Sequence, residues 1–296
     1  MAGMTGGAVA RDFGKPGAGG LGSKAQNALG KRVRNALGLV KSRAIPVALY
    51  LIVMYLLVRV SLTGAEAMGY NWQWYRIPDY LFRLTDDGFQ WGEISFGLVT
   101  TLALSLQAFL IALVAGLIVA LLRLSDLVVG SALAVAFLEF VRNMPLLVLL
   151  YLFYYVLGPI FGLDRYAASV LCLGVYHAAL VSEIFRAGIQ AVSAGQWEAA
   201  RSIGLSAGQT YRFVVLPQSI KFMLPPMAGE AVHIVKSSAI VSVIAVVELT
   251  TTGRNIIADT YLSFEVWFTV AVVYLAITLT LSIFVTFLEK RYAVKI

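Results

Sequence analysis

Charged and polar side chains interrupt two otherwise apolar stretches of this chain. The two groups are Glu139, Arg142 and Asn143, and Glu230, His233, Lys236 and Ser237. A charge at mid-bilayer costs about 2.5–3.5 kcal/mol on insertion scales, so it usually faces a partner or a water-filled path. Beside such a path, carboxylate and cationic side chains could meet the ammonium and carboxylate groups of a zwitterionic solute. We therefore take both groups as candidate substrate-pathway residues.

The first group also has a structural interpretation. Glu139 and Arg142 are three residues apart and can share a helix face, where they could neutralise each other. Such an ion pair would lock one helix against its neighbours, and this interpretation and the solute cavity stay open together. Glu183 and Arg186 repeat the spacing near the end of another apolar run, where a structural pair is favoured. His177, nearby, is typical of a buried, hydrogen-bonded histidine.

The second group contains the richest set of polar side chains. Glu230, His233 and Ser237 recur at intervals of three and four residues, which predicts a stripe on one helix face. If that helix begins near Phe222, Lys236 lies about 20 Å into the membrane at ~1.5 Å per residue. Because headgroups are hard to reach from there, Lys236 is favoured as a pore-lining charge over a buried ion-pair partner.

No catalytic or metal-binding arrangement competes with these groups. The chain has two histidines and a single cysteine, Cys172, which excludes a disulfide framework and leaves no cluster with metal-ligand spacing. The glycine-rich stretch at 14–22 lacks the spacing of a phosphate-binding loop. We therefore expect a protein that is not an enzyme and holds no cofactor, metal or nucleotide of its own. If this protein takes part in ATP-driven transport, another subunit must supply the ATPase.

The composition indicates the environment of these residues. Hydrophobic residues make up 59% of the 296 residues, charged residues 13%, and the mean hydropathy is +0.82. Soluble domains are roughly 45–50% apolar and about 25% charged, and a spanning helix needs about 20 apolar residues. Long apolar runs lie at approximately 45–63, 96–122, 131–158, 166–187, 222–248 and 266–288. We predict an all-α membrane protein with about six transmembrane helices.

These runs divide the chain into segments. We expect a basic, Gly/Ala-rich cytoplasmic tail at 1–44, a retained transmembrane helix at 45–63 and an aromatic-rich external loop at 64–95. The remaining transmembrane domain covers 96–292. Within it, Gly116 is expected at a close helix contact, and Pro145 is expected to bend or unwind the third run.

The distribution of charge predicts the orientation. Basic residues predominate before the first run, and Lys290, Arg291 and Lys295 end the chain. Under the positive-inside rule both termini are cytoplasmic, which six crossings allow. The net charge of +7 is then a topology signal and a contact with anionic membrane lipid, and we expect no nucleic-acid partner.

A polar segment at 191–218 lies between two apolar runs on the predicted cytoplasmic side. Its central part reads EAARSIGLSAGQTYRFVVLP from Glu198 to Pro217. Gly204 can adopt positive φ and separate two short helices, and Pro217 should hold Leu216 extended and stop the second. This predicts a helix-turn-helix on the membrane surface, available for contacts with a partner.

The spacing of this segment resembles the EAA loop of ABC-importer permease subunits. The residues that carry the pattern are Glu198, Ala199, Ala200, Arg201, Gly204, Leu216 and Pro217. The flanking stretches FVRNMPLLVLLYLFYY, SEIFRAGIQAVSAG, LPQSIKFMLPP and VKSSAIVSVIAVVELT resemble the polar amino-acid branch, which includes histidine, glutamine, glutamate and arginine permeases. Val214 replaces the usual isoleucine, and the first helix is additional to the family's five-helix core.

The resemblance implies a mechanism and a set of partners. The chain would be one permease subunit in a bacterial inner (plasma) membrane, paired with a second copy or a related permease. The EAA loop would dock on an ATP-binding subunit, and an external substrate-binding protein would deliver a polar amino acid of the glutamate, aspartate, glutamine or asparagine type. The alternative is an ion-coupled secondary carrier, in which the intramembrane Glu, His and Lys side chains would relay protons.

Overall fold

The computed structural model describes residues 45–61, 63–64, 67–85 and 88–292 and divides into two units, 1–71 and 72–296. In the first unit, Ile45–Ser61 form one apolar helix whose side chains are exposed within that unit. The tail predicted at 1–44 lies outside the described residues.

The second unit opens with short elements. They are a 3₁₀ turn, η1 (Trp74–Arg76), helix α2 (Ile77–Leu81) and an antiparallel hairpin of β1 (Phe82–Thr85) and β2 (Gly88–Trp91). This hairpin lies within the segment predicted as an aromatic-rich loop and was not predicted from the sequence. Its aromatic residues explain it, because Phe89 stacks on Phe82 at 6.2 Å and meets Trp91 edge-on at 5.0 Å, and cross-strand aromatic pairs stabilise hairpins.

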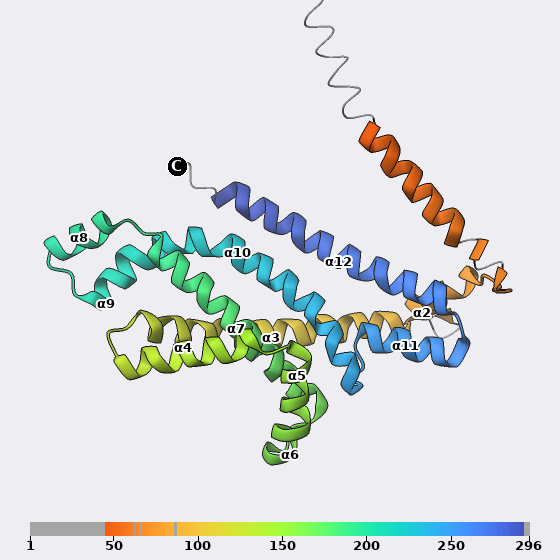
Figure 1. Ribbon diagram of the computed structural model, residues 1–296, viewed down its shortest axis with the longest axis horizontal. Helices are drawn as coiled ribbons and strands as arrows, with labels where there is room; N and C mark the ends of the chain where they lie inside the picture. The colour runs from red at the N-terminus through yellow and green to blue at the C-terminus, as the bar shows by residue number, and fades with distance from the viewer. Residues whose placement is uncertain (1–44, 62, 65–66, 86–87, 293–296) are drawn as a thin grey trace, which may run out of the picture. The chain divides into compact units, whose positions relative to one another are not determined.

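Long helices form the rest of the unit (Figure 1). They are α3 (Glu93–Leu124), α4 (Val128–Asn143), α7 (Arg165–Gln190), α10 (Leu216–Ser237) and α12 (Ser263–Tyr292). In the described part of the chain, four helices are long and apolar enough to span a membrane, and a bent pair makes a possible fifth. The predicted fold, a five-helix core with an additional N-terminal helix, is confirmed.

Helix α3 packs along α7 through small side chains. Its buried positions include Ala108, Ala112, Gly116 and Ala120, which recur every four residues and so lie on one face. A Cβ atom added at Gly116 would lie 2.7 Å from Cγ1 of Val181. The predicted close contact at Gly116 is thus confirmed, and it is the kind of small-residue packing that holds membrane helices together.

The third apolar run is broken. Met144 and Pro145 are both extended, with ψ of 135° and 133°, and the axis turns by 107° between Val128–Asn143 and Leu146–Phe161. The second part consists of α5 (Leu146–Tyr151), a π-helical turn η2 (Leu152–Leu157) and α6 (Gly158–Phe161), which project to one side of the bundle (Figure 1). The predicted bend at Pro145 is confirmed.

The run predicted at 222–248 also ends early. Helix α10 stops at Ser237, a 3₁₀ turn η4 (Ser238–Ile244) follows, and Ala245 adopts a left-handed φ of 56°. Sequence analysis missed the next helix, α11 (Leu249–Thr260). The buried carboxylate of Glu248 caps it by accepting the backbone N–H groups of Thr250 and Thr251 at 2.8 and 2.7 Å.

Candidate functional site: a projecting loop and intramembrane charges

The segment between α7 and α10 contains two short helices, α8 (Ala194–Ser202) and α9 (Ala207–Thr210), joined by a tight turn. Gly204 has a φ of +80°, as predicted. Its N–H donates to the carbonyl of Arg201 at 2.9 Å, and the N–H of Leu205 donates to that of Ala200 at 3.1 Å. This is the Schellman end of a helix, which glycine favours. Ser206 and Gln209 then cap α9 reciprocally.

Pro217 does not stop the second helix, contrary to the prediction. Leu216 is helical, with φ of −58° and ψ of −45°, and α9 continues through a π-helical turn η3 (Tyr211–Val215) into α10. Pro217 lies in the first turn of α10, where its missing N–H costs least. The backbone is therefore helical from α9 into the membrane-spanning part of α10.

The loop is anchored to the bundle at its base. The Trp197 ring meets the Tyr211 ring edge-on at 5.1 Å, and both pack on a cluster that includes Ile189, Val192 and Val215. Gln218 Nε2 also donates to Gln196 Oε1 at 3.1 Å. The loop is therefore a shaped projection at one end of the bundle, opposite the end that carries α2 and α11 (Figure 1).

Most of the predicted loop residues lie on its surface. Exposed residues are Glu198, Ala199, Arg201, Gly204, Leu216 and Pro217, whereas Ala200 is buried. Sequence analysis missed two exposed apolar side chains, Ile203 and Phe213, which are 76% and 62% exposed. Arg212 lies 5.6 Å from the centre of the Phe213 ring. The sequence did contain a signal for them, because both are large apolar residues in an otherwise polar segment. Apolar side chains rimmed by charges are typical of a surface that a partner covers.

The first intramembrane group lies at the end of α4. Asn143 Nδ2 donates to the Glu139 carboxylate at 3.0 Å and to its backbone carbonyl at 2.7 Å. The ion pair expected between Glu139 and Arg142 is not formed, because Arg142 Nη1 instead lies 4.0 Å from Glu183 of α7. All three side chains of this group are exposed in the single chain.

Glu183 connects three helices. It bonds to Arg186 at 2.7 Å within α7, pairs with Arg123 of α3 and lies within 4.0 Å of Arg142 of α4. The Glu183–Arg186 pair was predicted from spacing. The two arginines from other helices were not, since nothing local in the sequence identifies a partner 60 residues away.

The second intramembrane group separates into buried and exposed members. Glu230 is 8% exposed, and its Oε1 lies at hydrogen-bond distance, 2.5 Å, from His177 Nδ1 of α7. His233 Nδ1 lies 3.9 Å from the other carboxylate oxygen, but its side chain is 68% exposed. Lys236 is exposed, and Ser237 is half-buried at the end of α10. The side chains of the predicted stripe therefore lie in different environments, since Glu230 is buried and His233 is exposed.

The two groups meet α7 at different points. Arg142 approaches Glu183, and Glu230 binds His177, six positions earlier on the same helix. Within the described residues, no hydrogen bond or ion pair joins the α4 group directly to the α10 group. The same residues contain no cluster of three or more His, Cys, Asp or Glu side chains that could hold a metal ion.

A projecting loop with a helical connection to a charged spanning helix matches a known architecture. The family described as "Binding-protein-dependent transport system inner membrane component" matches residues 112–294, from the middle of α3 through α12. The chain belongs to this family. The match leaves out the helix at 45–61, which was predicted to be additional to the core.

Several permease proteins are similar to this chain over most of their own length. The probable glutamine ABC transporter permease protein GlnM of Bacillus subtilis is 39% identical over 197 residues, covering 66% of this chain and 91% of GlnM. The glutamine transport system permease protein GlnP of Escherichia coli K12 is 33% identical over 198 residues, covering 66% and 90%. The nopaline transport system permease protein NocM of Agrobacterium fabrum is 37% identical over 194 residues, covering 62% and 80%.

Two solved transporter structures are similar in fold to this chain. A crystal structure of an amino acid ABC transporter with histidines has a TM-score of 0.63 and 39% identity, over 67% of this chain and 94% of that one. The MetNI methionine ABC transporter has a TM-score of 0.53 at 19% identity, over 66% and 95%, and shows the shared fold. The chain is thus a multi-pass inner-membrane permease subunit of an amino-acid ABC importer, a transport component. The ion-coupled carrier is not favoured.

Proposed function

We propose that this permease is driven by an ATP-binding subunit that docks on α8, α9 and the turn at Gly204. The observation that carries the proposal is the projecting loop, which presents Ile203 and Phe213 beside Glu198, Arg201 and Arg212. Such apolar side chains surrounded by charges suit a groove of a partner protein. Because α9 continues into α10, closure of the partner would move the helix that carries Glu230 and Lys236.

The proposal includes a second permease subunit and an external binding protein. His233 and Lys236 are exposed on a spanning helix, and a cation facing lipid is costly. A second copy, or a related permease, would cover this face and enclose an aqueous path between the two. The binding protein, implied by the family's description, would deliver solute at the end that carries α2 and α11. The two termini and the α8–α9 loop would then be cytoplasmic.

We assign the solute to polar amino acids, of the glutamate, aspartate, glutamine or asparagine type. Support comes from relatives named for glutamine. Lys236 would meet the carboxylate of the solute. Glu139, Arg142, Asn143, His233 and Ser237 are the other candidate pathway residues, and Glu230 would position α10 through His177. Among these, Lys236 forms no ion pair within the described residues and is the strongest candidate for direct contact.

Co-purification tests the docking surface. The tagged chain would be extracted gently from its native membranes as wild type, as Ile203→Asp and as Phe213→Asp, and bound ATPase would be quantified. We expect the wild type to bring an ATP-binding subunit and both variants to lose it.

Leu127→Asp is the matched control. Leu127 is 65% exposed in the α3–α4 connection, at the same end of the bundle, and aspartate is favoured at this helix-capping position. This variant should keep the ATPase. Retention of the ATPase by both loop variants would contradict the proposal.

A further inference from the structure

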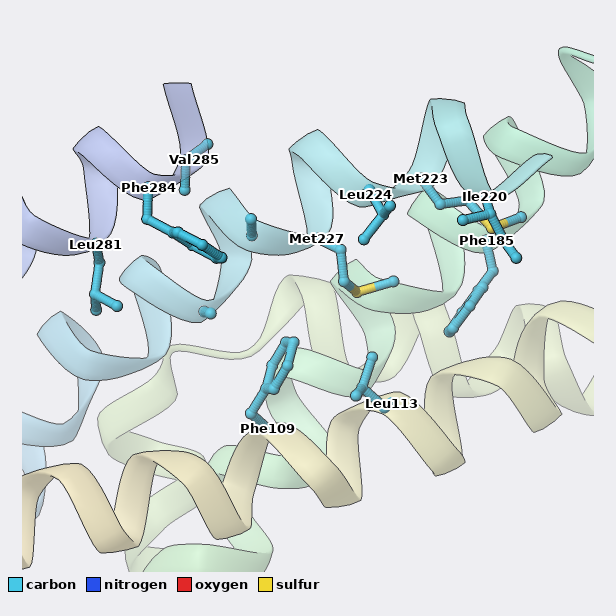
Figure 2. A pocket seen from close by; sticks show the side chains of 12 residues that line it. Phe109, Leu113, Phe185, Ile220, Met223, Leu224, Met227, Leu281, Phe284 and Val285 are labelled. Carbon is cyan, nitrogen blue, oxygen red and sulfur yellow. The ribbon is translucent and has the colours of Figure 1, made fainter. Parts of the chain in front are cut away.

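A wedge-shaped cavity of about 490 Å³ opens between α3, α7, α10 and α12. All twelve lining side chains are apolar (Figure 2). Phe109 and Leu113 point from α3 toward Met227 of α10, and Leu281 and Phe284 of α12 close one side. The volume lies within the roughly 300–1,000 Å³ of sites that bind small ligands. We call this cavity the apolar wedge.

The chemistry of the apolar wedge excludes the transported solute. No lining side chain offers a hydrogen bond or a charge, and burying an unpaired ammonium or carboxylate group is costly. An occupant must therefore be apolar along the length of the wedge. The four surrounding helices all cross the membrane by length and composition, so the hydrocarbon tails of lipid are the apolar molecules at hand.

The position of the wedge on α10 separates it from the proposed solute path. At 3.6 residues per turn, Leu224 and Ala228 lie on the side of α10 roughly opposite His233 and Lys236. If the polar side meets the second permease, a step that rests on the proposed function, the wedge faces lipid. The two sides of one helix would thus serve a solute path and a lipid site.

A basic residue stands at one end of the wedge. Lys221 directly follows the lining residue Ile220, and at 3.6 residues per turn it lies on the same side of α10 as the lining residue Ala228. Its side chain is exposed. Lys290 of α12, in contrast, lies on the side of that helix opposite the lining residues Leu281, Phe284 and Val285. Since α10 begins at the end of the bundle that carries the α8–α9 loop (Figure 1), the Lys221 ammonium group lies where a headgroup phosphate of that leaflet would lie.

We infer that the apolar wedge binds one acyl chain of an anionic phospholipid, with the headgroup against Lys221. The occupant holds α12 apart from α3 at its C-terminal half and fills a space that the side chains leave open. By lying against the first turns of α10, the lipid supports the helix to which the α8–α9 loop is joined.

Native mass spectrometry tests the inference on the full protein. The purified chain would be stripped of loosely bound lipid, then titrated with phosphatidylglycerol or with phosphatidylcholine of the same acyl chains. We expect wild type to retain phosphatidylglycerol preferentially. Ala231→Phe, which fills the wedge, should lower this retention at least about tenfold, since each buried CH₂ of a lipid chain contributes to binding.

Substitution of Lys221 tests the headgroup contact without altering the packing. Lys221→Gln should lower phosphatidylglycerol retention about fivefold and leave phosphatidylcholine unchanged. Three controls should retain lipid as wild type does: Lys290→Gln on the far side of α12, Lys236→Gln on the opposite side of α10, and Ala276→Phe on α12 outside the wedge.

The same spectra identify the outcomes that would overturn the inference. Equal retention of both lipids by wild type, or unchanged retention in Ala231→Phe and in Lys221→Gln, would exclude the site. If Ala231→Phe changed the mass of the assembly from dimer to monomer without changing the lipid count, a second copy would be the occupant. Failure of the proposed solute path would appear instead as normal amino-acid uptake by Lys236→Gln, which leaves the lipid result untouched.

Discussion

His177 Nδ1 lies 2.5 Å from Glu230 Oε1, and this buried contact ties α7 to α10 across 53 residues of sequence. Both side chains are almost fully enclosed, and His177 Nε2 has no hydrogen-bond partner among the described residues. The contact holds α10 against α7. His233 and Lys236 lie further along α10 than Glu230. Glu230 is thus a positioning residue in this account.

Glu230→Ala should destabilise the protein strongly. It leaves both nitrogens of His177 buried and unpaired, and removing one partner of a buried pair costs about 3–5 kcal/mol. Glu230→Gln keeps an acceptor and should cost less. Thermal unfolding in detergent would measure both, with His233→Ala as the control, expected within about 0.5 kcal/mol of wild type because that side chain is largely exposed. Equal loss in Glu230→Ala and His233→Ala would contradict a special role for the buried contact.

Gly116→Val should separate α3 from α7. The added Cβ would lie 2.7 Å from Val181 Cγ1 and 3.0 Å from the Ala178 carbonyl oxygen, and overpacking of this kind costs about 1–3 kcal/mol. This loss of stability would be measured as a lower unfolding temperature. Gly229→Ala is the control, since nothing lies within 4 Å of a Cβ there. A Gly116→Val protein as stable as the control would show that the helices can move apart freely.

Gly204→Val should weaken ATPase binding without unfolding the bundle. Open space surrounds a Cβ at this position, so the penalty comes from the φ of +80°, which costs an ordinary residue roughly 1–2 kcal/mol. Gly204→Asn should be milder, because asparagine tolerates this conformation.

The amount of ATPase that co-purifies with each variant would measure the effect. Gly208→Ala, in the helical part of the same loop, should behave as wild type. A Gly204→Val variant that binds as much ATPase as Gly208→Ala would show that the turn geometry is dispensable.

Part of this organisation was predictable because it is local. Apolar length identifies the spans, and single residues identify the turn at Gly204, the contact at Gly116 and the break at Pro145. Helix α11 was missed because Arg254, Asn255 and Asp259 make it too polar to resemble a span.

The polar contacts depend on distant segments, so local spacing could not identify them. Glu183 selects Arg123 and Arg142 from two other helices, and Glu230 selects His177 rather than a neighbour on α10. The helical course through Pro217 was missed for a different reason. The residue before a proline usually avoids the helical conformation, but Leu216 is helical and Pro217 lies in the first turn of α10, where its missing N–H costs least.

Lys236→Met should lower uptake strongly while leaving assembly intact. The side chain is exposed and contributes no ion pair within the described chain, so its loss should not affect folding. A charge-assisted bond to a solute carboxylate is worth about 1.5–3 kcal/mol, which predicts at least a tenfold fall in uptake of labelled glutamine by a deletion strain carrying the variant. Lys236→Arg should retain part of the activity. Normal uptake by Lys236→Met would remove this residue from the solute path.

The most direct test of the account is the energy source of transport. The complex that co-purifies with this chain would be reconstituted in vesicles with its binding protein, and labelled glutamine uptake would be measured with ATP on the side of the α8–α9 loop, or with only a proton or sodium gradient. The account predicts uptake that requires ATP and is lost in Phe213→Asp. Uptake driven by a gradient without ATP, and unaffected by Phe213→Asp, would contradict it.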